Sequence, residues 1–510
     1  MSLLAVDVGS SRCKAVLFSA AGEILAHSAR EYSPQFPRPG FAELNAFVFW
    51  DALCTTARAA AAGAYHDPVT AMCIASHAET FVPVDADNQP LHPAILNMDT
   101  RATSEAAWLE EQLGRRRIFE LTGHIVHPMY PAAKILWLKR HSPDVFAAAR
   151  RFFGVTDFLL ARLGLPARID YSLASRFLLF DVRRSCWSDE MLAAAGIASD
   201  RLPAPVPAGT LAGQLSAEPA AQLGIPSGTA VVVGGHDQPC GALGVGVTQP
   251  GRVADSMGTY ECLLASSPRP TLSDAAFSAS LNSYPHVVPE QFVTLAYFPS
   301  GIMVKWLHDL LYGGETGSGE VAEEEHYFQL EARAPAEPSG ICVLPHLIGT
   351  CNPDFNPRAR GTIFGLTPAT SRGQLYKAVL EGIACELSQM VEILSRAVGD
   401  FTDVYSSGGG THSPLGLNLR SALSGRRFHV MRCEEAVCLG AAMLAGVATR
   451  TYSSFAQALA ALVREEAVLE PDPALAAAYD FQLRQYRSLY PALALVRDLS
   501  AHFAKGGEPQ

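Results

Sequence analysis

The chain has 510 residues, a formal net charge of −11, 49% apolar residues and 17% charged residues. This length exceeds what one hydrophobic core supports, so we expect two or three domains, and the composition is that of a folded globular protein. The acidic balance argues against a general nucleic-acid-coating protein, and no apolar run is long enough to span a membrane.

The first part of the chain predicts alternating short strands and helices. Three strands are expected to form an antiparallel meander with tight turns between them: Leu3–Val8, Lys14–Ser19 and Glu23–Ala29. A helix over Phe47–Ala62 and a buried strand over Val69–Ser76 follow. A further apolar strand starts at Gly228 and ends in Gly234-Gly235-His236-Asp237-Gln238, and Thr248–Gly251 has the composition of a linker.

After that linker the opening pattern partly recurs. Arg252–Leu264 again predicts strand, turn and strand, and superposing Gly9 on Gly258 places Ser10 on Thr259. This recurrence indicates two duplicated halves, each presenting a turn to a ligand between them. The elements expected after it are a strand over Asp403–Ser406, the run Gly408-Gly409-Gly410-Thr411, and helices over Pro414–Ala422, Glu435–Val447 and Pro473–Leu499. The start of the helix at Pro414 favours negative charge.

The first turn gathers groups that suit a phosphate chain with its Mg²⁺. Asp7 is followed by Gly9, Ser10, Ser11 and Lys14, so a carboxylate, two hydroxyls, a cation and free backbone N–H groups meet at a hairpin tip. The N–H groups and the lysine would face the anion, and the carboxylate would face the metal or its waters. An ordinary turn, in which Asp and Gly occur for conformational reasons, is the alternative.

Further motifs follow in a fixed order, and jointly they carry a resemblance. In chain order they are the Asp7–Lys14 turn, Asn97-Met98-Asp99-Thr100-Arg101-Ala102, Asp170–Ser175 with Phe180-Asp181 and Trp187, Gly234–Gln238, Ser256–Thr259, Leu344-Pro345-His346 with Ala359-Arg360-Gly361, Glu381-Gly382, and Gly408–Gly410. With these motifs the chain resembles the FGGY carbohydrate kinases, of the sugar kinase, actin and Hsp70 superfold, from the N-terminus to about Ala448.

The resemblance implies an α/β fold with two actin-like (ribonuclease H-like) domains and a nucleotide cleft between them. Residues 1–247 would hold the substrate and the catalytic base, and residues 248–455 would hold the nucleotide. A helical extension, residues 456–510, would pack on the second domain.

The resemblance also implies roles for individual residues. ATP is expected against Ser10, Ser11, Lys14, Gly258, Thr259, Gly409 and Gly410, and Mg²⁺ against Asp7, directly or through water, and Asp237. Asp237 matches the family's catalytic base, in a phosphoryl transfer that depends more on positioning than on strong activation of the nucleophile. His236 is expected to be a packing or hydrogen-bonding neighbour rather than a second base.

Substrate contacts are expected from Glu79, Asp99, Arg101, Asp237 and Gln238. Glu79 can accept two hydroxyl protons of a polyol, whereas Asp99 and Arg101 are equally consistent with a structural ion pair. The expected acceptor is a small sugar or polyol, most of all a ketose such as xylulose or fuculose, with glycerol, an aldonate or an autoinducer-2-like polyol as alternatives. The chain departs from each subfamily: Ala78 replaces the arginine of glycerol kinases, and the Gly-Gln-Met-His-Gly-like run of xylulokinases is missing.

Two other protein classes remain open: an actin- or Hsp70-like nucleotide-switch protein, and a degenerate binding protein that kept only the fold. The Asp99-Thr100-Arg101 segment argues against the first, and the retained Asp7 and Asp237 argue against the second. We expect a cytoplasmic enzyme with reduced thiols, because the eleven cysteines lack the paired spacings of a zinc site. Its partners would be ATP and the sugar, with no nucleic acid or membrane, and a homodimer is possible.

Overall fold

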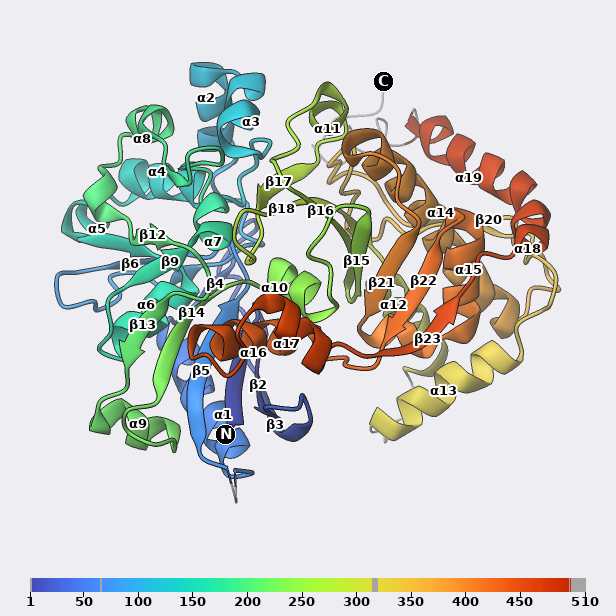
Figure 1. Cartoon of the computed structure of the whole chain (residues 1–510). Helices are drawn as coiled ribbons and strands as arrows, with labels where there is room; N and C mark the ends of the chain where they lie inside the picture. The colour runs from blue at the N-terminus through green and yellow to red at the C-terminus, as the bar shows by residue number, and fades with distance from the viewer. Residues whose placement is uncertain (1, 65–66, 314–319, 495, 497–510) are drawn as a thin grey trace.

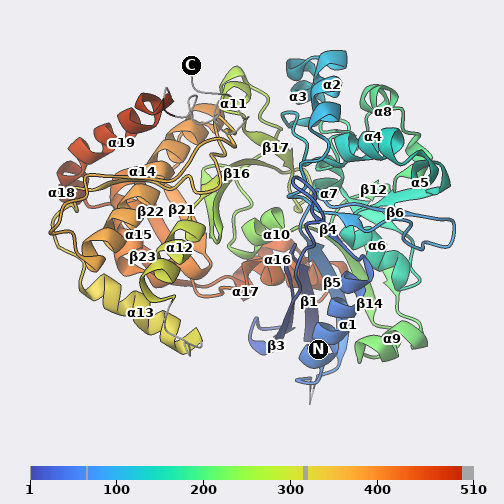
Figure 2. The same cartoon turned by 180° about the vertical axis from the view of Figure 1, so that it is seen from behind.

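The computed structural model describes residues 2–64, 67–313, 320–494 and 496, and these form two lobes that stand side by side (Figures 1 and 2). Each lobe is built on one mixed β-sheet. Among the described helices, none is long and apolar enough to cross a membrane.

The first lobe contains a six-stranded sheet in the order β13-β14-β5-β1-β2-β3. Its strands are β1 (Ser2–Val8), β2 (Arg12–Ser19), β3 (Ile24–Glu31), β5 (Val69–Ser76), β13 (Leu211–Gln214) and β14 (Ala230–His236). The predicted meander, the helix after it and the two buried strands are therefore confirmed. The central strand β1 is buried along most of its length, whereas the edge strand β3 alternates between exposed and half-buried positions, as a strand with one solvated face does.

The second lobe contains a seven-stranded sheet in the order β17-β18-β16-β15-β21-β22-β23. Its strands are β15 (Arg252–Met257), β16 (Tyr260–Ser267), β17 (Asn282–Pro285), β18 (Phe292–Pro299), β21 (Asp403–Ser407), β22 (Arg427–Met431) and β23 (Glu465–Leu469). The order β18-β16-β15-β21-β22-β23 repeats the order β3-β2-β1-β5-β14-β13 of the first sheet, with the same sequence of antiparallel and parallel pairs. The duplication predicted from the two Gly-containing turns is present in the topology.

The helices of the first lobe form two groups, one packed on the sheet and one beyond it. In the first lobe they are α1 (Phe47–Ala61), α2 (Thr103–Leu113), α3 (Arg115–Thr122), α4 (Pro131–His141), α5 (Pro143–Ala148), α6 (Val155–Arg162), α7 (Tyr171–Ser175), α8 (Asp189–Ala195), α9 (Ala217–Leu223) and α10 (Asp237–Gly244). Helix α1 fills one core with the sheet, and helices α2, α4, α7 and α8 build a separate core that extends this lobe. Short strand pairs accompany them: β4 (Glu43–Leu44) with β7 (Ala94–Ile95), β6 (Val82–Val84) with β8 (Arg151–Phe153), β9 (Arg168–Asp170) with β12 (Ala204–Val206), and β10 (Phe180–Asp181) with β11 (Cys186–Trp187).

The second lobe has its own helices and one short strand pair, β19 (Cys342–Leu344) with β20 (Thr362–Phe364). The helices are α11 (Asp274–Ser278), α12 (Gly301–Tyr312), α13 (Glu320–Ala332), α14 (Arg372–Val398), α15 (Pro414–Ser424), α18 (Pro473–Ala478) and α19 (Asp480–Ala492). Buried side chains of the long helix α14 pack against the second sheet and form the centre of this hydrophobic core. A single helix was expected over Pro473–Leu499, but the chain divides at Tyr479, whose buried hydroxyl donates to Glu381 of α14 at 2.6 Å; the end of that range lies outside the described residues.

Two helices late in the sequence return to the first lobe. Helix α16 (Ala436–Ala448) packs on α10 and against β1 and β5, and α17 (Phe455–Leu462) shares that core, below the centre of Figure 1. The sequence analysis assigns α16 to the second domain and expects α17 to pack on it, whereas both helices pack against the first lobe; the domain boundaries themselves stay a prediction. The physical reason is that α16 is apolar on all sides. Such a sequence predicts that the helix is buried, but it does not indicate which of the two sheets the helix packs against. Strand β23 and helices α18 and α19 do pack on the second lobe.

Candidate active site

Asp7 lies in β1 at the start of the hairpin tip, opposite Lys14 of β2 in the strand register. Its Oδ1 atom is buried and has no hydrogen-bond partner. Burial raises the pKa of Asp7 to about 8; the charges of Asp237 and Glu435 act in the same direction, and Lys14 opposes them. The ionised form of Asp7 is therefore unfavourable in this structure, because Lys14 does not offset burial and the two neighbouring negative charges. A further cation beside Asp7 would favour the ionised form.

Asp237 is the first residue of α10 and directly follows β14. Its Oδ1 lies 3.0 Å from Nε2 of His236. Burial acts to raise the pKa of Asp237, but the charge and contact of His236, together with His77, outweigh it, so the pKa lies below the usual value. The start of a helix also favours a negative charge. Asp237 is therefore ionised near neutral pH, as an acceptor of a hydroxyl proton must be.

The two carboxylates fit a Mg²⁺ ion that also binds phosphate. No group of three or more His, Cys, Asp or Glu side chains is placed to hold a metal within the described part of the chain. Mg²⁺ does not require one, because it keeps several waters and commonly takes only one or two carboxylates plus substrate phosphates. A bound divalent cation would give the Asp7 Oδ1 atom a partner and would reduce the repulsion between Asp7 and Asp237.

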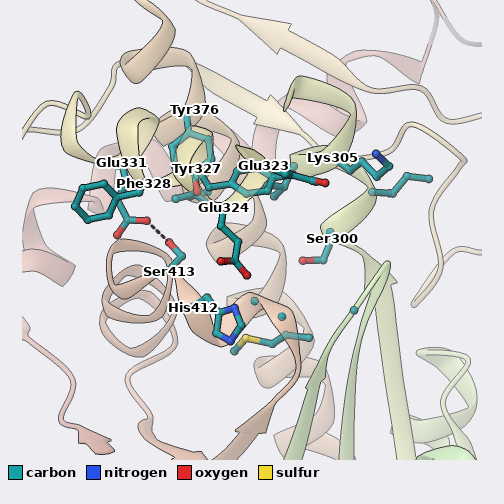
Figure 3. Close-up of a pocket in the computed structure, with 18 of the residues that line it drawn as sticks. Ser300, Lys305, Glu323, Glu324, Tyr327, Phe328, Glu331, Tyr376, His412 and Ser413 are labelled. Carbon is teal, nitrogen blue, oxygen red and sulfur yellow. Dashed lines mark hydrogen bonds between the residues drawn. The ribbon is translucent and has the colours of Figure 1, made fainter. Parts of the chain in front are cut away.

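A cavity of 1470 Å³ in the second lobe brings together the later Gly-containing turns. Gly258 and Thr259 of the β15–β16 turn line it, as do Gly409 and Gly410 after β21. Figure 3 shows its walls: Tyr327, Phe328 and Tyr376 on one side, His412 and Ser413 on another. Glycine is needed at 410, because an added Cβ would lie 2.7 Å from the Cβ of Met257. Volume and aromatic lining suit a nucleotide.

The start of α15 already holds an anion of the chain itself. Glu331 of α13 accepts hydrogen bonds from the Ser413 hydroxyl at 2.7 Å and from the Leu415 backbone N–H at 2.8 Å, and the first bond is drawn in Figure 3. The sequence predicts that this helix start favours negative charge, and Glu331 supplies that charge. Glu331 therefore occupies the helix start that a phosphate chain would otherwise use, and in the β15–β16 turn the Gly258 backbone N–H donates to the Tyr260 carbonyl oxygen at 3.0 Å.

The remaining residues predicted for ATP lie on the first lobe, at the tip between β1 and β2. Ser10 is half-buried and Ser11 is exposed. The Nζ atom of Lys14 lies 2.8 and 2.9 Å from the two carboxylate oxygens of Glu435. Ser10, Ser11 and Lys14 are not among the residues that line the cavity. The predicted nucleotide residues thus lie partly at the β1–β2 tip of the first lobe and partly in the cavity of the second lobe, and their role in binding ATP stays a prediction.

Glu79 sits in a strained loop after β5, with a φ of 61°. Its carboxylate accepts a hydrogen bond from Nε of Arg176, and both side chains are buried. The Arg176 guanidinium also lies 5.3 Å from the ring centres of both Tyr130 and Tyr284. Glu79 therefore uses part of its hydrogen-bonding capacity on Arg176, a residue that the sequence did not predict for the site.

Around Glu79 and Asp237 lies a buried polar cluster drawn from both lobes. Asn282 of β17 accepts hydrogen bonds from His124 Nδ1 and from the Tyr130 hydroxyl, each at 3.0 Å. Several buried polar atoms of this cluster have no partner in the described structure: His124 Nε2, His236 Nδ1, Gln238 Oε1 and the Tyr284 hydroxyl. Buried polar atoms are nearly always hydrogen-bonded, so this group predicts a polar ligand rich in hydroxyls.

Asp99 and Arg101 form a closed ion-pair network. Arg101 Nη2 lies 2.8 Å from Asp99 Oδ2 and 2.7 Å from Glu43 Oε1, and Asp99 also accepts from the Ala42 backbone N–H at 2.6 Å. The Arg101 guanidinium stacks over Phe41 at 3.9 Å. The structure contains the ion pair that the sequence offered as one of two alternatives, and contact of Asp99 or Arg101 with the acceptor stays a prediction.

We expect replacement of Arg101 by methionine to destabilise the fold by about 3 kcal/mol, because it leaves the buried Asp99 charge without a cation. Urea unfolding measures the change. The matched control is Arg117→Met, which removes the exposed partner of Glu190 and should cost at most about 0.5 kcal/mol. A variant of normal stability with a much higher KM for the acceptor would instead support direct substrate contact by Arg101.

Sequence reasoning missed Arg176, His124, Tyr130, Asn282 and Tyr284. Arg176 directly follows the Asp170–Ser175 motif, which was the one local signal available. That motif itself is structural: Asp170 caps α7, and the Ser172 hydroxyl donates to it while accepting from the His236 backbone N–H. The motif thereby anchors the end of β14 where Asp237 begins.

Comparisons with known proteins identify the family of the chain. The model of the N-terminal domain of the FGGY family of carbohydrate kinases matches residues 2–244, and that of the C-terminal domain matches residues 253–449. The xylulose kinase of Escherichia coli (strain K12) is 30% identical over 497 residues, which cover 96% of this chain and 99% of that protein. The gluconokinase of Bacillus subtilis (strain 168) is 26% identical over 459 residues, covering 89% and 88%.

A solved structure gives the same result in three dimensions. The xylulose kinase from Rhodospirillum rubrum superposes with a TM-score of 0.85 at 26% identity, over 98% of this chain and 100% of that chain. Two family models that together match most of the chain, a full-length relative and a full-length structure therefore agree. The chain belongs to the FGGY family of carbohydrate kinases.

Proposed function

We propose that this kinase transfers the γ-phosphoryl group of ATP to a hydroxyl of a small neutral sugar or polyol, with Asp237 as the general base. The observation that carries the proposal is the set of unpartnered buried polar atoms around the ionised Asp237. Such atoms need hydrogen-bonding groups from a ligand, and a polyol offers donors and acceptors in dense array.

The residues divide the work between the lobes. The second-lobe cavity would hold adenosine against Gly409 and Gly410, with the phosphates toward Gly258 and Thr259. Asp7, with Asp237 near it, would hold Mg²⁺, which neutralises charge on the phosphates when bound. Asp237 would orient the acceptor hydroxyl and take its proton as the bond to phosphorus forms.

The charges of the cluster favour a neutral acceptor over an aldonate. Arg176 is paired with Glu79. Burial lowers the pKa of Lys134 to about 7, and its Nζ donates to the backbone carbonyls of Glu79 at 3.1 Å and Leu96 at 2.5 Å. Both buried cations are therefore already engaged, and a sugar carboxylate would find no dedicated partner. Among the acceptors in the names of the relatives, this favours a ketose such as xylulose over gluconate.

The test is ADP release from Mg-ATP across a panel of xylulose, fuculose, ribulose, glycerol, gluconate and an autoinducer-2-like polyol. We expect a neutral ketose to give the highest kcat/KM, at least about tenfold above gluconate, because an uncompensated buried carboxylate is disfavoured. Gluconate as the best acceptor would refute the charge argument while leaving the kinase assignment intact. The expected cytoplasmic location and the possible homodimer stay predictions.

A further inference from the structure

Lys14 and Glu435 form an ion pair that joins residues far apart in sequence. Both Glu435 carboxylate oxygens lie within 2.9 Å of the Lys14 Nζ atom, and each side chain is 31% exposed. An ammonium group has three N–H donors, and this geometry commits two of them to Glu435. One donor is left for another anion.

The place of Glu435 in the fold is unusual for a helix-terminal glutamate. It is the N-cap residue of α16, yet its side chain makes no capping hydrogen bond to its own helix. It stands where the chain leaves β22 of the second sheet and enters a helix packed on the first sheet. Its carboxylate instead reaches the tip of the β1–β2 hairpin.

The neighbouring residue reaches the opposite way. Glu434 pairs with His412, whose side chain lines the nucleotide cavity, at 2.9 Å between His412 Nε2 and Glu434 Oε1. Two consecutive glutamates therefore contact the cavity rim and the hairpin that carries Asp7. A phosphate chain that runs from the Gly409–Gly410 turn toward Asp7 would pass along this dipeptide, within reach of Lys14.

We propose that Glu435 is the positioning residue of Lys14: it fixes the ammonium group at the hairpin tip with one N–H directed to a phosphate oxygen of the nucleotide. This inference rests on the proposed function, because it assumes that a phosphate chain reaches the hairpin. Glu435 does not touch the reacting atoms. Because Glu435 holds the long, flexible Lys14 side chain in place beforehand, this side chain does not have to be ordered during phosphoryl transfer.

This role predicts a split between rate and binding. Without Glu435, the Lys14 side chain must be ordered during the reaction, which corresponds to a loss of about three- to tenfold in kcat. The affinity for ADP should not fall, because a negative charge near the phosphates has also been removed. Lys14→Met, by contrast, should weaken ADP binding about tenfold and leave AMP binding unchanged.

The experiment is a double-mutant cycle on the full chain, with Glu435→Ala, Lys14→Met and the combined variant. Calorimetry measures the affinities for Mg-ADP and AMP, and steady-state kinetics with the best acceptor of the panel give kcat and KM. Glu190→Ala is the matched control, since it removes a carboxylate that binds Arg117 through two hydrogen bonds outside the cleft, and it should change each value less than about twofold. If Glu435→Ala is insoluble, Glu435→Gln serves for every comparison.

The expected result is that loss of Glu435 lowers kcat in the wild-type background and has no further effect once Lys14 is methionine. The proposal is overturned if the loss in kcat persists in the Lys14→Met background, if kcat is unchanged, or if Glu435→Ala weakens ADP and AMP binding alike. The affinities for Mg-ADP and AMP are measured without an acceptor, so they test the role of Glu435 even when no acceptor is known. If no acceptor of the panel supports turnover, that result contradicts the proposed function and not the role of Glu435.

Discussion

Asp237→Asn is expected to lower kcat about a thousandfold, while the affinity for Mg-ADP stays within about threefold of wild type. General bases contribute on the order of a hundred- to ten-thousandfold, and asparagine keeps the shape of the side chain but cannot take the proton. Asp237 is suited to this role because its pKa lies below the usual value, so it is ionised across the neutral range. The measurement is steady-state kinetics with the best acceptor, beside calorimetry of nucleotide binding.

The control for this variant is Asp200→Asn, which removes the same charge from an exposed pair with Arg150 and should leave kcat unchanged. Sugar-dependent turnover that survives Asp237→Asn within about tenfold would remove Asp237 from the mechanism. An equal loss of ADP affinity would indicate damage to the nucleotide site instead of a lost proton acceptor.

Much of the fold was open to prediction because local patterns control it. The hairpin tips at Gly9 and Gly258 are short-range features, set by turn residues between apolar runs, and both occur where the sequence places them. The duplication of the two sheets could also be predicted, because the strand–turn–strand pattern around Gly9 recurs around Gly258. The position of α16 could not be predicted, because a helix that is apolar all round can be buried against either sheet.

The residues of the candidate site also fall into those that local patterns predict and those that depend on tertiary contacts. Asp7, Asp237 and the Gly409–Gly410 turn stand at strand ends, and a strand end is visible in the sequence. The partner of Glu79 is not visible, because Arg176 lies 97 residues away and only the packed lobe brings it near. Asn282 comes from the other lobe altogether, 158 residues from His124. Pairwise contacts at such separations depend on the tertiary fold, so they were missed.

Asp7→Asn is expected to abolish most activity and yet stabilise the metal-free protein at high pH. Folding raises the pKa of Asp7 to about 8, chiefly by burial and next by the charge of Asp237. Between pH 4 and 8 the folded chain then holds a proton that the unfolded chain has lost, so the Asp7 contribution to stability falls as the pH rises through this range. Asparagine is neutral at every pH and removes this dependence.

Thermal unfolding in EDTA measures the effect. The difference in Tm between Asp7→Asn and wild type should widen by roughly 5 °C from pH 5 to pH 9. Mg-ATP should raise the Tm of wild type more than that of the variant, since only wild type offers the carboxylate that the metal needs. A Tm difference independent of pH would show that Asp7 is not buried as an uncompensated acid. Equal stabilisation of both proteins by Mg-ATP would show that the metal binds without it. The residue that limits the stability of the empty enzyme is thus expected to be the one that binds the metal.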